Sequence, residues 1–105
     1  MTTKVESTTF EKEVLQSSQP VLVDFWAPWC SPCLRLASTI DALASEYAGR
    51  VKFAKVNVDD NQDLAVRFGI RGIPTVMVFK GGKVKASLVG LRPKEDLARA
   101  LDDTL

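Results

Sequence analysis

The sequence contains no histidine, and cysteine occurs only twice, at Cys30 and Cys33. Without histidine the chain cannot form a Ser/His or Cys/His catalytic triad. Two cysteines alone do not complete a zinc or iron site, and the carboxylates that would have to supply the other ligands are poor partners for a soft metal. They are also too few for the several disulfides of a small secreted domain. We therefore expect no bound metal or other cofactor, and the two thiols themselves become the candidate reactive groups.

An excess of one charge sign and long apolar runs are missing as well. The 14 basic and 13 acidic residues are spread along the chain, without the basic stripe that nucleic acids or anionic membranes attract. No 18 consecutive apolar residues occur, and the first residues, MTTKVEST, have no apolar run behind their lysine. The sequence thus favours a cytoplasmic protein that binds neither nucleic acid nor membranes.

What is present is a chain of 105 residues with 46% hydrophobic content, which predicts one domain over residues 1–105. Helical and extended patterns alternate along it. We expect helices near 8–16, 32–49, 60–69 and from Pro93 onward, strands over 20–27 and 51–58, and a hairpin over 75–90. This order predicts an α/β fold with a mixed sheet.

Two local motifs support these boundaries. Thr8 and Glu11 have the spacing of a capping box at the start of the first helix. Gly81 and Gly82 can take the positive φ angles of a two-residue hairpin turn, which explains the GGK triplet better than a phosphate-binding loop does.

The two cysteines lie where the strand over 20–27 ends and the next helix begins. The unpaired amides and the dipole at a helix start stabilise a thiolate. Cys30 can direct its sulfur at these amides, which predicts the nucleophile, whereas Cys33 is expected on the buried side of the helix as the resolving thiol. Pro32 fixes the bend between them. A pair of metal ligands and a pair of inert core cysteines remain as less favoured alternatives to thiol–disulfide exchange.

Four stretches, VLVDFWAPWCSPC, KVNVD, GIRGIPTVMVFKGGK and LVG, occur in an order and at separations that resemble the thioredoxin family over essentially the whole chain. The resemblance implies a thioredoxin fold, with a central mixed sheet of about five strands flanked by about four helices. It also implies that Cys30 and Cys33 form a redox-active disulfide, and that their dithiol form reduces disulfides in client proteins. A thioredoxin reductase, either NADPH/flavin-dependent or ferredoxin-linked, would recharge the protein, which we expect to be monomeric.

The resemblance also assigns roles to further residues. Asp24 matches the buried acid beneath the resolving cysteine, where it would transfer a proton, and Lys55 matches the lysine that opposes the rise of its pKa. Judged from the residues alone, Asp24 could equally face solvent at the end of a strand. Pro74 matches a cis-proline whose loop lies against the cysteines, although an ordinary trans turn fits the residues equally well.

The same resemblance implies a surface that binds client proteins. It is an apolar collar around Cys30 that binds extended segments through main-chain contacts. Its expected members are Trp29, Pro32, Gly72, Ile73, Pro74, Val89 and Gly90. Trp26 is expected to pack beside the site instead.

The chain departs from the family pattern around the cysteines. Ser31 replaces a usual glycine, Leu34 a usual lysine and Ser38 a usual proline, and Pro28 stands where an acid is common. We expect Ser31 and Leu34 to affect redox potential and partner choice, and Ser38 to leave the long helix without a kink. Two alternatives to a disulfide reductase stay open, namely an oxidase or isomerase of the same fold and a non-catalytic binding subunit.

Overall fold

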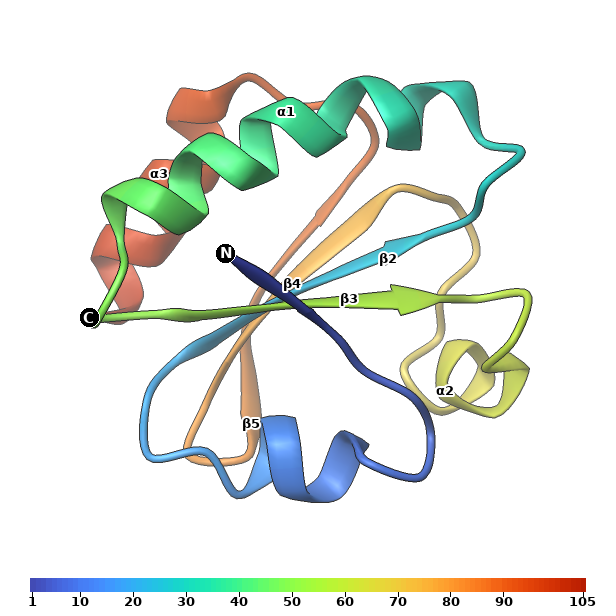
Figure 1. Ribbon diagram of the computed structural model, residues 1–105, viewed down its shortest axis with the longest axis horizontal. Coiled ribbons are helices and arrows are strands. Elements are labelled where there is room, and N and C mark those ends of the chain that lie inside the picture. Colours follow the sequence, from blue (N-terminus) through green and yellow to red (C-terminus); the bar gives the residue numbers. More distant parts are fainter.

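The computed structural model describes residues 1–105 and contains five strands and four helices (Figure 1). In chain order these are β1 (Thr2–Lys4), the short π-helix η1 (Glu11–Leu15), β2 (Val21–Trp26), α1 (Ser31–Glu46), β3 (Lys52–Asn57), α2 (Gln62–Arg67), β4 (Thr75–Lys80), β5 (Lys83–Val89) and α3 (Lys94–Thr104). No helix in it is long and apolar enough to cross a membrane.

The strands form one sheet in the order β1-β3-β2-β4-β5. The β1–β3 and β2–β3 pairs are parallel, whereas the β2–β4 and β4–β5 pairs are antiparallel. The predicted mixed sheet is therefore confirmed. Its centre is β2, whose residues Val21–Phe25 are all buried, as expected for a strand covered on both faces.

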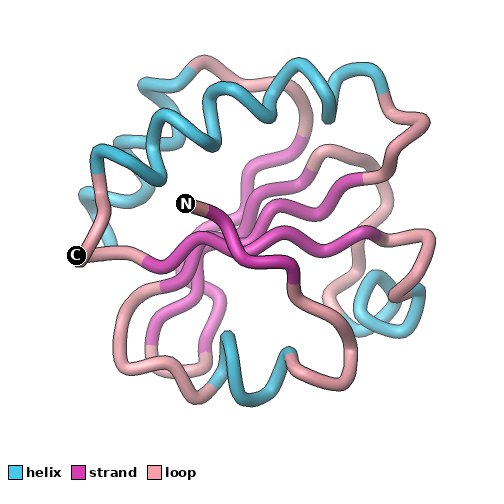
Figure 2. The backbone as a smooth tube through the Cα atoms, viewed as in Figure 1, coloured by secondary structure: helices cyan, strands magenta, loops and turns pink.

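Helices cover both faces of the sheet. In Figures 1 and 2, α1 and α3 lie on one side, and η1 and α2 lie on the other. Side chains of β2 alternate between the two layers. Leu22 belongs to the core under α1 and α3, while Val21, Val23 and Phe25 belong to the core under η1 and α2. Asp24, two residues after Leu22, consequently lies on the α1 side.

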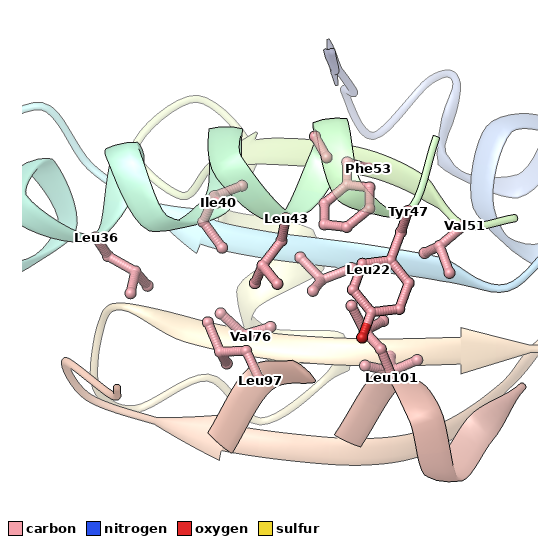
Figure 3. Close-up of a cluster of buried hydrophobic side chains, with 12 residues drawn as sticks. Leu22, Leu36, Ile40, Leu43, Tyr47, Val51, Phe53, Val76, Leu97 and Leu101 are labelled. Atoms are coloured by element: carbon pink, nitrogen blue, oxygen red, sulfur yellow. The ribbon is translucent and has the colours of Figure 1, made fainter. Parts of the chain in front are cut away.

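The core under α1 is built from the helical periodicity of the sequence. Figure 3 shows Leu36 and Leu43 of α1 pointing into the layer that also contains Leu22 of the sheet, with Leu97 and Leu101 of α3 on its other side. The two residues of α1 are seven positions apart and the two of α3 are four apart, so each pair shares one face of its helix. This packing fixes the start of α1, and thus the cysteines, against the sheet.

The structure corrects several predicted boundaries. The capping box is wrong: η1 has Phe10 at its N-cap with no side-chain hydrogen bond, and the hydroxyl of Thr9 instead accepts from the Glu6 N–H at 3.1 Å. Strand β1 had no signal in the residue pattern, because three mostly polar residues are too few to show a period. The helices α1 and α2 are shorter than predicted.

At the other end of the chain, Pro93 is the N-cap of α3 rather than its first helical residue. The hairpin prediction is confirmed. Gly81 and Gly82 have φ angles of 60° and 78° between β4 and β5.

Candidate active site

Cys30 and Cys33 form a disulfide at the start of α1, with their Cα atoms 5.2 Å apart. Cys30 is the N-cap residue, and its extended backbone (φ −90°, ψ 103°) turns the Sγ atom back toward the helix, where it accepts from the Cys33 N–H at 3.2 Å. Pro32 lies within the first helical turn, where its missing N–H breaks no hydrogen bond. Both cysteines are buried, with 4% and 2% of their surface exposed.

The loop before β4 lies against this disulfide. The Ile73–Pro74 peptide bond is cis, and the Ile73 carbonyl oxygen is 3.7 Å from Cys30 Sγ. The loop is anchored at both ends, because the Thr75 hydroxyl donates to the Gly72 carbonyl at 2.6 Å and the Gly90 N–H donates to the Pro74 carbonyl at 2.8 Å. Ile73 also packs on the small apolar cluster that contains both cysteines.

The same anchoring brings the end of β5 to the site. Val89 pairs with Thr75, the first residue of β4, so it lies next to the loop that precedes β4. A side chain at Gly72 would lie 3.6 Å from Val89 Cγ1. Val89 is 55% exposed. The expected collar residues from 72–74 and 89–90 are therefore together, beside Cys30.

The two tryptophans take different positions. Trp29 is 69% exposed, and its Nε1–H donates to the two carboxylate oxygens of Asp59 at 2.9 and 3.2 Å. Trp26 is half-buried and packs on the cysteine cluster, with Lys55 Nζ 5.0 Å from its ring centroid. The prediction that Trp26 packs beside the site agrees with this position. Asp59 was not anticipated from the sequence.

Asp24 is fully buried, which excludes the solvent-facing alternative. Neither of its carboxylate oxygens has a hydrogen-bond partner. Burial raises the pKa of Asp24 to about 6, although the positive charge of Lys55, its neighbour in register on β3, acts to lower that pKa. Asp24 lies on the face of the sheet that α1 covers, and it is the only buried carboxylate of the chain.

Three of the four residues that depart from the family pattern lie at the surface of α1. Ser31, Leu34 and Ser38 are exposed. The helix runs uninterrupted from Ser31 to Glu46, in agreement with the expectation for a chain without proline at position 38. No group of three or more His, Cys, Asp or Glu side chains is arranged to hold a metal ion.

A disulfide that caps a helix, faces a cis-proline loop and lies over the same sheet face as a buried carboxyl group defines a site for thiol–disulfide exchange. The family model Thioredoxin matches residues 1–103. Thioredoxin 1 from Nostoc sp. is 49% identical over 102 residues, which cover 97% of this chain and 95% of that protein. Thioredoxin 1 from Synechococcus elongatus is 52% identical over 101 residues, covering 96% and 94%.

Thioredoxin from Pseudomonas aeruginosa is 48% identical over 98 residues, covering 93% of this chain and 91% of that protein. The chain belongs to the thioredoxin family. It is a thiol–disulfide oxidoreductase of the protein-disulfide reductase type, and its redox-active group is the Cys30–Cys33 disulfide.

Proposed function

We propose that the protein reduces disulfides in client proteins, with Cys30 as the attacking thiol and Cys33 as the resolving thiol. The observation that carries this assignment is the hydrogen bond from the Cys33 N–H to Cys30 Sγ at the start of α1. A thiolate at Cys30 keeps this donor and gains about 0.3 to 2 kcal/mol from the helix dipole. Cys33 lies inside the first turn of α1, so its sulfur is not at the helix start as that of Cys30 is.

The reaction proceeds in two exchanges. The Cys30 thiolate attacks one sulfur of the client disulfide, the client S–S bond breaks, and its other sulfur leaves as a thiolate that takes up a proton. Cys33, once deprotonated, attacks Cys30 Sγ in the mixed disulfide. The second client sulfur then leaves, so two electrons have passed to the client and the Cys30–Cys33 disulfide has formed.

Asp24 is proposed to accept the Cys33 proton through water. With a pKa of about 6 it is largely ionised at pH 7, yet it is basic enough to take up a proton during the second exchange. Its place on the sheet face under α1 supports this role. Lys55 tunes the pKa of Asp24 and keeps it from rising further.

Clients are proposed to bind across the collar in an extended form. The Ile73 N–H makes no backbone hydrogen bond within the protein, so it is free to pair with a client strand. Trp29, Val89, Gly90, Gly72 and Pro74 surround it with a largely apolar surface. Ser31 and Pro32 lie at the helix start beside Cys30 and complete the contact.

We further propose that the protein acts in the cytoplasm as a monomer, with residues 1–105 as one thioredoxin domain, and carries electrons from a thioredoxin reductase. Whether that reductase is NADPH/flavin-dependent or ferredoxin-linked is decided by supplying the oxidised protein to each type. Reduction by one type and not by the other identifies the electron donor.

A trapping experiment tests the order of attack. The Cys33→Ser variant should accumulate a mixed disulfide with a client protein, visible as a higher band on a non-reducing gel, because the second exchange cannot occur. The matched Cys30→Ser variant should trap far less. Equal trapping by both variants, or by neither, would contradict the assignment of Cys30 as the nucleophile.

A further inference from the structure

A pocket of about 370 Å³ lies on the α1 side of the sheet, and none of its lining residues belongs to the client collar. Five residues line it: Thr2, Lys4, Trp26, Lys55 and Asn57. Lys4, Trp26 and Asn57 are the last residues of β1, β2 and β3, which run parallel. The pocket is therefore at the carboxyl ends of three parallel strands, where sheets of this class bind ligands.

The strand register places all five side chains on one face. Lys4 pairs with Lys55 across β1 and β3, and Asn57 pairs with Trp26 across β3 and β2. Thr2 pairs with Phe53, whose ring belongs to the core under α1. Since paired residues of neighbouring strands point to the same side, these groups converge in space although they come from three strands.

The lining is suited to a negatively charged ligand. It contains two ammonium groups, one hydroxyl and one amide, and it contains no carboxylate. Lys4 makes an ion pair with Glu6 at 3.4 Å, but both side chains are well exposed, so this pair is weak. Lys55 stands over the Trp26 ring instead of pairing with an acid. Lysine binds phosphate as a point charge, and hydroxyl and amide groups add hydrogen-bond donors.

We propose that this pocket binds a phosphate-type oxyanion, either inorganic phosphate or the phosphate group of a small ester, between Lys4 and Lys55. The hydroxyl of Thr2 and the amide of Asn57 donate to the remaining oxygens, and the indole of Trp26 forms the flat wall. With two exposed or half-exposed lysines as the main charges, the dissociation constant is expected to be on the order of 1 mM.

An occupant would communicate with the redox site through shared residues. Trp26 forms the pocket wall and also packs on the cysteine cluster. Lys55 is next to Asp24 in register. Of the charged groups at the pocket, Lys55 comes from β3 and Lys4 from β1, and Glu6 pairs with Lys4 at the rim. The β4 neighbour of Asp24 is the apolar Val76. An anion at Lys55 weakens its attraction for the Asp24 carboxylate, so the Asp24 pKa rises on binding.

The test is a titration of the whole protein with the ligand, monitored by ¹H–¹⁵N NMR. Sodium phosphate is compared with sodium chloride at the same ionic strength and pH. The backbone signals of Lys4, Lys55 and Asn57 and the indole signal of Trp26 should shift together and saturate with phosphate only. Shifts of equal size with chloride would overturn the proposal, because they would reflect screening alone.

Substitutions of the two lysines and a second ligand test the same site further. Lys4→Gln and Lys55→Gln should each weaken phosphate binding about fivefold or more, whereas Lys83→Gln, an exposed lysine at the hairpin, should leave it unchanged. Equal affinity in all three variants would also overturn the proposal. Glycerol 3-phosphate distinguishes the two sources: tighter binding than inorganic phosphate indicates an ester ligand, and equal binding indicates the free anion.

Discussion

At the scale of single residues, Asp24 combines a proposed catalytic role with a cost in stability. A carboxyl group with no exposed surface and no hydrogen-bond partner is unfavourable when it is charged. Its pKa rises from 3.8 to about 6 on folding, which at about 1.4 kcal/mol per unit corresponds to about 3 kcal/mol at neutral pH. The presence of such an unfavourable group is consistent with a function in proton transfer.

The first prediction concerns Asp24→Asn. At pH 7 the variant should be more stable by about 2 kcal/mol, somewhat less than the full figure because the buried amide also lacks partners. Folding raises the pKa of Asp24, so the folded form holds its proton more tightly and the wild type loses stability as pH rises from about 4 to about 6. The gain in the variant should therefore be absent near pH 4 and complete above pH 6, as measured by denaturant unfolding at each pH.

The same variant should be slower in disulfide reduction at pH 7 by about tenfold or more, since it lacks the proposed base. The control is Asp41→Asn, an exposed acid on α1, which should change neither stability nor rate. A variant of Asp24 that is stabilised yet retains full activity would show that the residue is not the base.

Residue chemistry alone identified the cysteine pair, because its spacing and its place after a buried strand are visible in the sequence. The partner of Trp29 was not visible. Asp59 lies 30 positions away and follows β3, and only the packing of β3 beside β2 brings its carboxylate to the indole. The residues next to Asp24 in the sequence likewise did not decide whether its side chain is buried. It is buried because α1 covers this face of the sheet.

At the scale of elements, the turn between β4 and β5 could be predicted from the sequence, but its contacts with the rest of the protein could not. Two glycines between two strands were enough to predict the turn. The sequence did not reveal that Gly82 lies against η1, where an added Cβ would be 3.1 Å from the Leu15 carbonyl oxygen. Helix boundaries were less accurate for the same reason, since tertiary contacts decide where a helix ends.

The second prediction compares alanine at the two turn positions. Gly81→Ala places a side chain at positive φ in open space and should cost roughly 1 kcal/mol of unfolding free energy. Gly82→Ala adds the close contact with Leu15 to the same backbone strain and should cost roughly 1 kcal/mol more. Denaturant unfolding measures both, and equal losses would show that the turn moves freely away from η1.

At the scale of the whole molecule, the fold ties the redox state to stability. The disulfide joins residues only three positions apart, so it restricts the unfolded chain by about 2 kcal/mol. Reduction releases this constraint but creates the Cys30 thiolate, which the helix start stabilises by about 0.3 to 2 kcal/mol. The balance of the two effects decides whether the folded protein favours the disulfide or the dithiol.

The last prediction uses this balance to separate a reductase from an oxidase of the same fold. In a reductase the folded protein favours the disulfide, so the oxidised form should be the more stable by up to about 2 kcal/mol. In an oxidase the reduced form is stabilised instead. Guanidinium unfolding at pH 7, with and without excess reductant, measures the sign directly. The double variant Cys30→Ser/Cys33→Ser should be insensitive to the reductant. A more stable reduced form in the wild type, together with ready reduction by a glutathione buffer, would contradict this prediction, because the free energy of folding would then drive electrons toward Cys30 and Cys33 and away from clients.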